Sequence, residues 1–380
     1  MKKNIDIFLN QLSIDINKYF DCNNSNVFRV KKTNNRDAFM YKLLLTRKSV
    51  TGQSVTDKIN FFKGTTIKSK VSRVSLIERQ QSIDVDFYKN LYKLISNKIN
   101  KTFFHKQPKI YAGDGIYNNT YHKFGNGMMA SKALSIGFFN CSTNMPVNLQ
   151  LLNRKFEVDG LLKNMSLLSS KSIIILDIGY TSYNLFDTLI EHNIDFICRI
   201  TKPIYVANTN KKYRYVKYEI NEKEYYLMTS LHNENKYTSD ILKELYHKRW
   251  TVEEYFKFIK LRTTYETIKQ HNTNEIIKST YCILIISQLI YLLSHVFSKP
   301  QKDMIVNKSS LMEGFYDHFL LRLIYNDKCG KKFNKSYIRS FIITYINLIK
   351  TVLDVSRPRV SKNTNSKWYN KSYQKGNYKK

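Results

Sequence analysis

Apolar residues recur at helical spacing through the first hundred positions of the chain. The stretches are Ile5–Phe20, Ala38–Leu45, Val55–Phe62 and Val85–Ile99. Apolar positions three and four apart form one face of a helix, and a folded chain buries that face. Basic runs at 29–36 and 68–74 separate the stretches. We therefore predict a helical, basic domain over residues 1–100 that docks on DNA; a helical bundle with a lysine-rich solvated face is the alternative.

The pattern changes near Gln107 to short β runs. These runs cover 109–115, 133–141, 145–152, 172–179 and 194–200, with helical stretches at 156–169 and 182–193. The run at 172–179 contains four consecutive apolar residues, Ile173 to Leu176, which is typical of a strand buried on both faces of a sheet. Alternating Tyr, Val and Lys favour a small β insertion at about 201–237. We predict an α/β domain over residues 107–265.

Helical patterns resume after the insertion. Ser239 or Asp240 is the expected cap of one long helix that runs to about Arg262, and a helical C-terminal region follows over 266–354. The most apolar stretch, Tyr281–Phe297, is slightly short for a membrane span and contains polar residues, so we expect a buried core helix. Residues 355–380 are basic and contain no acid, which is typical of a disordered tail.

Composition narrows the choice of partner. The 380 residues include 62 Lys and Arg against 30 Asp and Glu, which gives a formal net charge of +32. This charge favours a polyanion, either nucleic acid or an anionic membrane, over an acidic small molecule alone. The five cysteines are odd in number and include no Cys-x-x-Cys pair. They therefore disfavour a disulfide framework and a zinc finger.

Three acidic residues stand at informative positions. Asp114 ends one predicted strand, Asp177 ends the apolar strand, and Glu253 lies on the helix after the last strand. Ligands gather at the carboxyl ends of sheet strands, and carboxylates that meet there repel one another unless cations share them. Hard oxygen ligands select Mg²⁺ or Mn²⁺, and two such ions can promote in-line phosphoryl transfer. Each Asp taken alone also fits an ordinary turn or helix cap.

The helix around Glu253 adds cations beside this acid. Four residues fall within roughly 60° of one another at about 100° per residue: Tyr246, Arg249, Glu253 and Lys260. Arg249 and Lys260 are suited to gripping phosphate, and the Tyr246 hydroxyl can donate to a phosphate oxygen. The neighbouring acid, Glu254, points about 100° away from Glu253. The alternative is an ordinary i,i+4 ion pair between Arg249 and Glu253.

These motifs resemble those of the DDE cut-and-paste transposases of bacterial insertion sequences, specifically the insertion-sequence-four family. That family carries a Tyr-x2-Arg-x3-Glu-x6-Lys signature, which this chain has intact, with the common Trp250 after the Arg. The first family acid typically stands in Asp-Gly after a strand, as in Asp114-Gly115. The residue after this pair is usually Ser or Thr, and here it is Ile116.

The second family acid typically follows an apolar strand in the pattern Asp-x-Gly-Tyr, before a helix and a strand that ends in Arg. The matching residues are Asp177, Gly179, Tyr180 and Arg199. The resemblance covers about residues 107–297. It implies a ribonuclease-H-like catalytic domain with a β insertion, flanked by a helical N-terminal domain and C-terminal helices.

The resemblance also implies the chemistry. Asp114, Asp177 and Glu253 would be the catalytic residues and would hold two Mg²⁺ ions, with Mn²⁺ as a substitute. The enzyme would nick double-stranded DNA at the element's ends, form a hairpin from the freed 3′-OH, and finally join the end to target DNA. The residues that would contact DNA are Tyr246, Arg249, Trp250 and Lys260. Trp250 would stack on a flipped base or, alternatively, pack in the core. A homodimer would pair the two ends through the C-terminal helices, with no membrane partner.

Two other functions stay open. One is a catalytically silent, domesticated derivative that only binds DNA. The other is a different ribonuclease-H-like nuclease, such as a junction resolvase, although the 253 − 177 = 76 positions between the last two acids leave room for an insertion that compact nucleases lack. The compartment follows the host: cytoplasm and nucleoid in a bacterium, nucleus or viral factory in a eukaryotic or viral setting.

Overall fold

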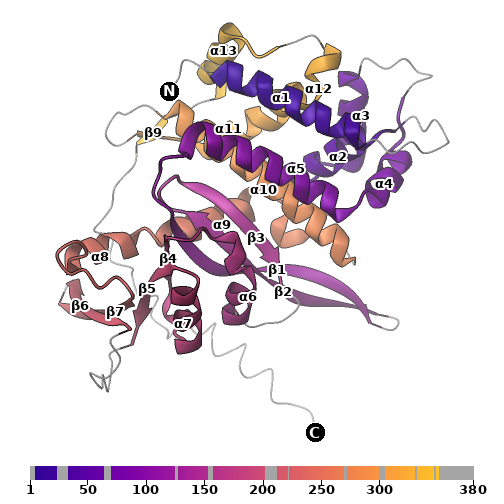
Figure 1. Cartoon of the computed structure of the whole chain (residues 1–380). Helices are drawn as coiled ribbons and strands as arrows, with labels where there is room; N and C mark the ends of the chain where they lie inside the picture. The colour runs from indigo at the N-terminus through magenta and orange to yellow at the C-terminus, as the bar shows by residue number, and fades with distance from the viewer. Residues whose placement is uncertain are drawn as a thin grey trace.

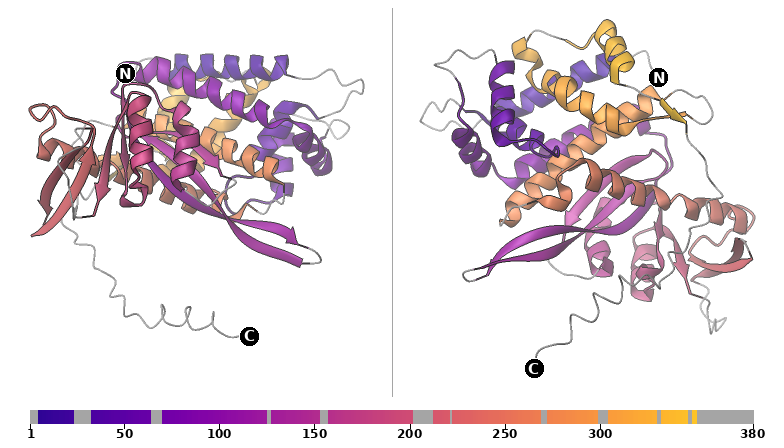
Figure 2. Two further views of the ribbon diagram at one scale, coloured as in Figure 1. Left: turned by 60° about the horizontal axis from the view of Figure 1, so that its bottom comes forward. Right: turned by 180° about the vertical axis from the view of Figure 1, so that it is seen from behind.

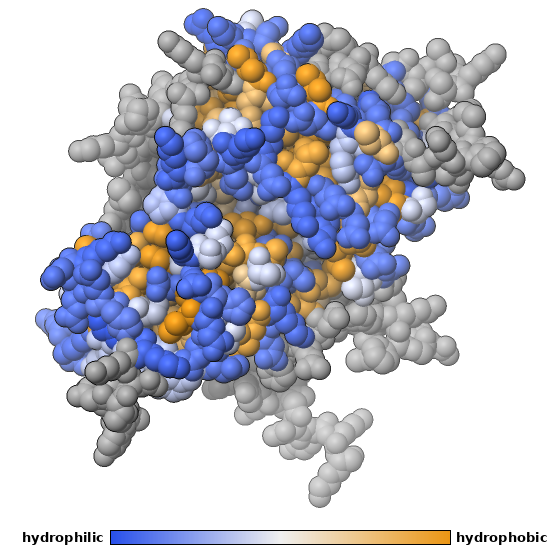
Figure 3. All heavy atoms as spheres, in the orientation of Figure 1, coloured by the Kyte–Doolittle hydropathy of each residue, from blue (hydrophilic) through white to orange (hydrophobic). Residues whose placement is uncertain are grey.

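The computed structural model describes residues 5–23, 33–63, 70–124, 127–152, 157–201, 212–220, 222–268, 272–298, 304–329, 332–345 and 348–350. The predicted basic tail, 355–380, lies outside the described residues. A seven-stranded sheet has helices on both faces. Further helices form an additional layer on one side, outside the helices that cover that face of the sheet (Figure 1). Hydrophilic residues cover most of the face seen in Figure 3, and apolar residues reach this surface in small patches.

The N-terminal segment is helical where the apolar spacing predicts helices. The helices are α1 (Ile5–Cys22), α2 (Asn35–Leu44), α3 (Gly52–Phe62), α4 (Arg73–Ser82) and α5 (Val85–Ile99), followed by a π-helical turn, η3 (Asn100–Phe104). A polar side chain accepts a backbone hydrogen bond at the start of each of α2 to α5: Asn34, Thr51, Ser72 and Asp84. Such caps satisfy amides that have no partner inside the helix, so they fix where each helix begins.

The sheet has the strand order β3-β2-β1-β4-β5-β7-β6. Its strands are β1 (Ile110–Phe124), β2 (Gly127–Asn140), β3 (Met145–Leu151), β4 (Ser172–Leu176), β5 (Ile194–Ile200), β6 (Arg214–Ile220) and β7 (Lys223–Thr229). The central strands β1, β4 and β5 are parallel, and the other neighbouring pairs are antiparallel. Because β7 pairs with β5, the β segment expected at 201–237 extends the main sheet at its edge.

Five helices cover the two faces of the sheet: α6 (Glu157–Asn164), α7 (Tyr183–Glu191), α8 (Ser239–His247), α9 (Trp250–Arg262) and α10 (Thr273–Phe297). Successive side chains of a strand point to opposite faces. Tyr111 and Phe138 pack with the buried residues of α6 and α7. The next residues along the same strands, Ala112 and Phe139, pack with those of α9 and α10. The central strands are therefore buried from both sides.

Helix α10 is the longest described helix, and it holds the helical layer together. It is long and apolar enough to cross a membrane, but 89% of its apolar window is buried inside the molecule. It packs against β3, α2 and α5, as well as α11 (Lys308–Gly314). Beyond α11 come η7 (Phe315–Phe319), α12 (Leu320–Cys329) and α13 (Lys335–Tyr345), and β8 (Met304–Val306) pairs with β9 (Leu348–Lys350). The expected core helix therefore joins the N-terminal and C-terminal helices in one hydrophobic core.

Several element ends differ from the sequence prediction, and two of these differences affect the region of the acids. The strand predicted at 109–115 continues to Phe124, because β2 pairs with it along a hairpin that extends beyond the rest of the sheet (Figure 2). The long helix predicted through Arg262 begins after a cap by Thr238 and is interrupted at Lys248 and Arg249. Amide hydrogen bonds around this interruption reach three residues back, which is the tighter 3₁₀ pattern, so α8 and α9 are separate helices.

A buried ion cluster joins α10 to the N-terminal helices. Glu275 Oε2 accepts from Lys42 Nζ at 2.9 Å, and Glu275 Oε1 accepts from Lys278 Nζ at 2.8 Å. Each lysine side chain is 3% exposed. Burial disfavours the charged form and lowers the pKa of Lys42. In this cluster the Glu275 carboxylate therefore bonds two buried cations at once.

Replacing Glu275 by alanine should destabilise the fold by about 3–5 kcal/mol, because it removes the carboxylate that both buried lysines bond. Urea unfolding at pH 7.5 measures this loss. The control is Glu254→Ala on α9, where the side chain is 53% exposed and its pair with Lys257 spans 3.9 Å. This control should change the free energy of unfolding by no more than about 0.5 kcal/mol. Equal stability of the two variants would contradict the prediction.

Candidate active site

Asp114 lies within β1, two residues beyond the last pair between β1 and β4, which joins Ala112 to Ile175. The sequence predicted the end of β1 here, but it is the neighbouring strand that ends. The Asp114 carboxylate is half-buried, and its Oδ1 accepts a hydrogen bond from the Gly115 amide at 2.8 Å. Because β4 stops beside it, Asp114 borders the segment that follows β4.

Asp177 begins that segment, directly before the 3₁₀ turn η5 (Ile178–Tyr180). Its carbonyl accepts from the Tyr180 amide at 3.0 Å and from Cys198 Sγ at 3.4 Å, which fixes the backbone at the strand end. Its Oδ1 accepts a hydrogen bond from the Tyr246 hydroxyl at 3.2 Å. The first two acids thus lie at the carboxyl ends of neighbouring parallel strand segments, where open sheets bind ligands.

Glu253 comes to the same region from α9, in the first turn of that helix. The glycine opposite Asp114 in the β1–β2 pair explains how α9 fits there. Gly137 pairs with Asp114, and a side-chain carbon at Gly137 would be 2.7 Å from the Phe256 ring. Phe256 lies one turn beyond Glu253. The missing side chain therefore lets α9 lie directly against the strands at Asp114.

Arg249 connects the acids. Its Nη2 donates to Glu253 Oε1 at 2.6 Å, and the two side chains are 11% and 31% exposed. Its guanidinium carbon lies 5.8 Å from the centre of the Tyr246 ring. Burial works to lower the pKa of Arg249, but Tyr246, Asp177 and Glu253 outweigh burial and raise it. The i,i+4 pair that was the alternative interpretation is therefore present, as part of a larger network.

The pKa of Asp114 is raised to about 6. Burial is the largest cause, and the carboxylates of Glu157 and Glu253 act in the same direction. The hydrogen bond from Gly115 and the charge of Arg249 act against this shift. The Gly115 hydrogen bond and the Arg249 charge therefore compensate only part of the cost of the charged Asp114 carboxylate.

Two residues expected to contact DNA lie at the margin of the acids. Trp250 is 43% exposed, so it is not packed in the core. Lys260 lies seven residues after Glu253, about 10 Å along the helix axis. Its Nζ is 3.9 Å from Glu266 Oε1, and its carbonyl accepts from Lys48 Nζ at 2.5 Å. The structure therefore gathers Tyr246 and Arg249 with the three acids and leaves Lys260 two turns away.

Sequence reasoning missed Glu157, the first residue of α6. A side-chain carbon at Gly115 would be 3.1 Å from Glu157 Cγ and would overlap its carboxyl group. Tyr180 is 1% exposed, and its hydroxyl has no partner at standard hydrogen-bond geometry among the described residues. Burial, followed by the charges of Glu157 and Asp114, raises the pKa of Tyr180. Tyr180 stood in a recognisable motif, whereas nothing in the sequence around Glu157 marked it.

The donors fit a hard divalent cation in chemistry, since every candidate ligand is a carboxylate oxygen. The buried Tyr180 hydroxyl lies beside these acids and interacts with the Glu157 carboxyl by charge and by a side-chain hydrogen bond. As the side chains stand, the described residues contain no group of three or more His, Cys, Asp or Glu placed together to hold a metal ion. Glu253 instead bonds Arg249, so the guanidinium supplies the positive charge on this side.

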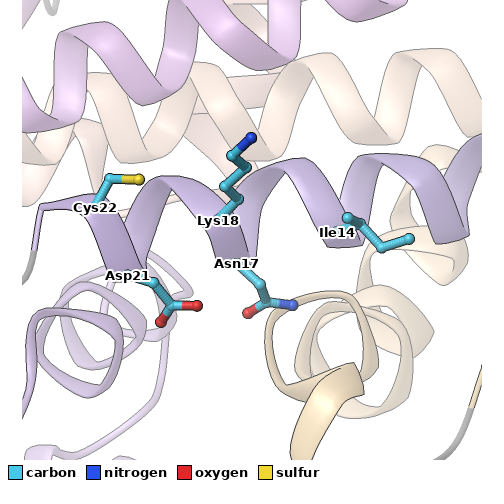
Figure 4. A pocket seen from close by; sticks show the side chains of 5 residues that line it. All are labelled: Ile14, Asn17, Lys18, Asp21 and Cys22. Carbon is cyan, nitrogen blue, oxygen red and sulfur yellow. The ribbon is translucent and has the colours of Figure 1, made fainter.

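A hollow on α1 is separate from these residues. It is lined by Ile14, Asn17, Lys18, Asp21 and Cys22 (Figure 4). The side chains of Lys18 and Cys22 point away from those of Asn17 and Asp21 (Figure 4). Because its polar groups diverge, this hollow has no set of donors aimed at one ligand.

Comparison with known proteins adds a family match at this point. Residues 146–281 match the family model described as the transposase DDE domain. This match supports a DDE transposase. The matched segment covers a little over a third of the chain; it includes Asp177 and Glu253 and begins after Asp114.

Other comparisons are more distant. No curated protein matches the chain. Among solved structures, the chain is similar to a cryo-EM structure of the piggyBac transposase synaptic complex with hairpin DNA. The two are 13% identical with a TM-score of 0.48, and the similarity covers 90% of this chain and 83% of that chain.

The raised pKa of Asp114 predicts a stability effect with a definite sign. The carboxyl ionises near its ordinary pKa of 3.8 in the unfolded chain and near 6 in the folded protein. The folded state therefore binds more protons between these values, and its stability falls as the pH rises through this window. Without divalent metal, Asp114→Asn should stabilise the protein at pH 7.5 by up to about 3 kcal/mol. The gain should vanish below about pH 4.

Urea unfolding in EDTA at pH 7.5 and pH 4 measures this difference. The control is Asp187→Asn on α7, because hydrogen bonds from Tyr213 at 2.6 Å and Lys212 at 3.1 Å lower the pKa of Asp187. That variant should lose stability at neutral pH, where the wild-type carboxylate is charged and bonded. If Asp114→Asn is no more stable than the wild type at pH 7.5, the prediction is wrong, because burial of the charged Asp114 carboxylate then does not lower the free energy of unfolding.

Proposed function

We propose that this chain is a DNA transposase that cleaves and joins DNA strands by divalent-metal-dependent phosphoryl transfer. One observation carries the proposal. Asp114, Asp177 and Glu253 come from three separate elements, and a single buried arginine, Arg249, interacts with all of them. The family match of residues 146–281 supports the transposase class.

The topology supports a ribonuclease-H-like catalytic domain. Three antiparallel strands, β1 to β3, are followed by β4 and β5, which run parallel to β1. The sheet has helices on both faces. Asp114 and Asp177 lie just beyond the point where the pairing between β1 and β4 ends. Both features agree with the arrangement that the resemblance implies. Within the transposases, the spacing of Tyr246, Arg249, Glu253 and Lys260 supports the insertion-sequence-four family.

Asp114, Asp177 and Glu253 would hold Mg²⁺, or Mn²⁺ in its place. Such ions, when bound, stabilise the charge that develops on the attacking and leaving oxygens of a phosphodiester. Water attacks phosphorus at the element's end and the P–O3′ bond breaks, which leaves a 3′-OH on the element. That hydroxyl then attacks the opposite strand, forming a hairpin and releasing the 3′-OH of the flanking DNA. A second water opens the hairpin and restores the 3′-OH of the element, which finally attacks a phosphodiester of the target and releases a target 3′-OH.

The chain's own groups would orient these partners. The Tyr246 hydroxyl holds one oxygen of Asp177, and Arg249 holds one oxygen of Glu253. Fixed orientation of carboxylates is what outer hydrogen-bond partners supply at metal sites. Trp250, exposed next to Arg249, offers a ring on which an unpaired base could stack.

The remaining contacts with DNA follow from charge. A net charge of +32 supports binding along the phosphate backbone by the helical region 1–100 and by the lysine-rich surface. Lys260 would contact a phosphate two turns from the acids. We include in the proposal a homodimer that pairs two DNA ends.

Each of the three single variants, Asp114→Ala, Asp177→Ala and Glu253→Ala, should abolish cleavage of DNA ends. Loss of an outer partner costs a metal site about 10–100-fold, so loss of a ligand should cost at least about 100-fold. The substrate is a plasmid that carries the DNA flanking the protein's own gene, with Mg²⁺, and the breaks are mapped. Binding of the same DNA should persist. Glu254→Ala, on the solvent side of α9, is the matched control and should cut normally.

The outcomes separate the candidate functions. Residual cutting in all three alanine variants would mean that other residues perform the chemistry. Tight binding without any breaks by the wild type would favour a silent DNA-binding derivative. Preferential cutting of branched DNA or of RNA–DNA hybrids over linear ends would favour another nuclease.

Trp250→Ala should weaken binding to DNA ends that carry an unpaired base. A base stacked on an aromatic ring contributes about 1–3 kcal/mol, so the Kd should rise about tenfold. Fluorescence anisotropy with labelled DNA measures the Kd, and thermal unfolding checks that the fold is kept. The control is Leu261→Ala, since Leu261 lies on the same helix and is 55% exposed. A Kd equal to that of wild type would remove Trp250 from the DNA-binding surface.

A further inference from the structure

We propose that Arg47, Lys58 and Asp317 form a pocket that binds one phosphate group of the DNA backbone. Arg47 stands in the turn between α2 and α3, Lys58 lies on α3, and Asp317 belongs to η7. All three lie outside the segment 146–281 that matches the transposase DDE domain. The inference rests on the proposed function, since it assumes that the chain binds DNA and adds a contact away from the acids.

The three side chains line a hollow of about 210 Å³ in the helical layer. Each of them is partly exposed, so an anion from solvent can reach them. Tyr316, the neighbour of Asp317 on η7, forms another part of the wall. The hollow therefore contains two cations, one acid and room for a further group.

The two cations converge on one oxygen atom. Arg47 Nη1 donates to Asp317 Oδ1 at 2.8 Å, and Lys58 Nζ donates to the same atom at 2.6 Å. Burial works to raise the pKa of Asp317, but Lys58 and Arg47 outweigh burial and lower it, so this carboxylate is charged at neutral pH. Two cations and one acid leave a net charge of 2 − 1 = +1 in the hollow. An anion is therefore the ligand that fits it.

The geometry of the cations suits phosphate in particular. The Arg47 fork and the Lys58 ammonium together have more N–H donors than one carboxylate oxygen can accept, and both groups bind phosphate oxygens well. The guanidinium carbon of Arg47 lies 5.8 Å from the centre of the Tyr316 ring. The Tyr316 hydroxyl is hydrogen-bonded to Thr46 Oγ1 at 2.8 Å, which fixes this ring beside the turn. Arg47 is therefore held in place before any phosphate arrives.

The pocket is tied to the end of α9, the helix that carries Glu253. Arg47 pairs with Thr263 in an isolated β-bridge, and the Thr264 amide donates to the Thr46 carbonyl at 2.8 Å. Thr263 lies 263 − 253 = 10 positions after Glu253, which is about 15 Å along the helix axis. One turn of DNA spans about 34 Å, so one duplex is long enough to reach both places. A phosphate held here would anchor DNA at a fixed distance from the acids.

The alternative is that the two ion pairs only tie α3 to η7. The two roles differ in what the loss of the acid does to DNA binding. If the pairs are purely structural, Asp317→Asn lowers the stability of the fold and does not improve the affinity for DNA. If the hollow binds phosphate, the same variant frees Arg47 and Lys58 from their competing carboxylate, and DNA binds more tightly.

The test measures the Kd of labelled duplex DNA from the flanks of the protein's own gene, by fluorescence anisotropy at several salt concentrations. Asp317→Asn should lower the Kd about tenfold, the order of magnitude of one hydrogen bond to a charged group. Lys58→Gln should raise the Kd about tenfold, because Arg47 and Asp317 then neutralise each other. It should also reduce the slope of log K against log salt by about 0.9, the share of one phosphate. An Asp317→Asn protein that binds DNA no more tightly than the wild type would overturn the inference.

The matched controls come from the ion pair between Lys98 on α5 and Asp15 on α1. This pair has the same 2.6 Å separation as Lys58 and Asp317, and its side chains are 31% and 29% exposed, against 26% and 37%. Lys98→Gln and Asp15→Asn change the net charge by the same amounts. They should leave the Kd within about twofold of the wild type, since charges more than about 10 Å from DNA are largely screened. Equal shifts in the control variants would mean that net charge alone sets the affinity, and would also overturn the inference.

Thermal unfolding confirms that each variant is folded, and cleavage by the wild type separates the two proposals. If the wild type neither binds nor cuts this DNA, both proposals fail. If it cuts the DNA, while Lys58→Gln and Asp317→Asn keep its Kd and salt slope, the transposase stands and only the pocket fails. Calorimetry with inorganic phosphate covers the other source of this ligand. Phosphate binding that is lost in Lys58→Gln, with DNA affinity unchanged, would assign the pocket to free phosphate and overturn the contact with DNA.

Discussion

Carboxylates that share a partly buried corner repel one another, and Arg249 limits this repulsion on the α9 side of the sheet. Its position depends on the interruption between α8 and α9. The tighter backbone at Lys248 and Arg249 ends one helix and begins the next. As a result, Tyr246 on α8 bonds Asp177, while Arg249 bonds Glu253 on α9. A single regular helix would hold both side chains on one straight stripe, with less freedom to contact two different acids.

Two glycines let helices approach the β1–β2 pair from opposite faces. Gly137 leaves room for the Phe256 ring, which brings α9 and its Glu253 over Asp114. Gly115 leaves room for the Glu157 carboxyl at the start of α6. A strand normally covers both its faces with side chains, so an approach this close requires positions that lack one. Glu157 and Glu253 come near enough for their charges to act on Asp114 because the sheet is thin at these two positions and because β4 ends beside Asp114.

The local parts of this arrangement could be predicted from the sequence, and the long-range parts could not. Apolar spacing predicted α1, α2, α3 and α5, the buried strands and the core helix α10, since each pattern reports on burial within one element, but it did not mark α4. The break at Lys248 and Arg249 escaped prediction because Lys and Arg are ordinary helix formers, and neither position is a Gly or Pro that would signal a break. Glu157 escaped because its importance depends on Gly115, forty-two positions earlier in the chain. Ile116, the departure from the family pattern, is 2% exposed and belongs to the hydrophobic core.

The pairing of Arg249 with Glu253 has a consequence for any cation that binds here. A guanidinium and a divalent ion compete for the same oxygens, and the guanidinium cannot lose its proton to give way. A phosphate group offers Arg249 an alternative partner of suitable geometry. Under the proposed function, a DNA phosphate that takes Arg249 releases Glu253 toward Asp114 and Asp177. DNA and metal would then favour each other's binding, because each competes with the Arg249–Glu253 ion pair: DNA binds Arg249, and the metal binds Glu253. Such coupling is reciprocal by thermodynamic necessity.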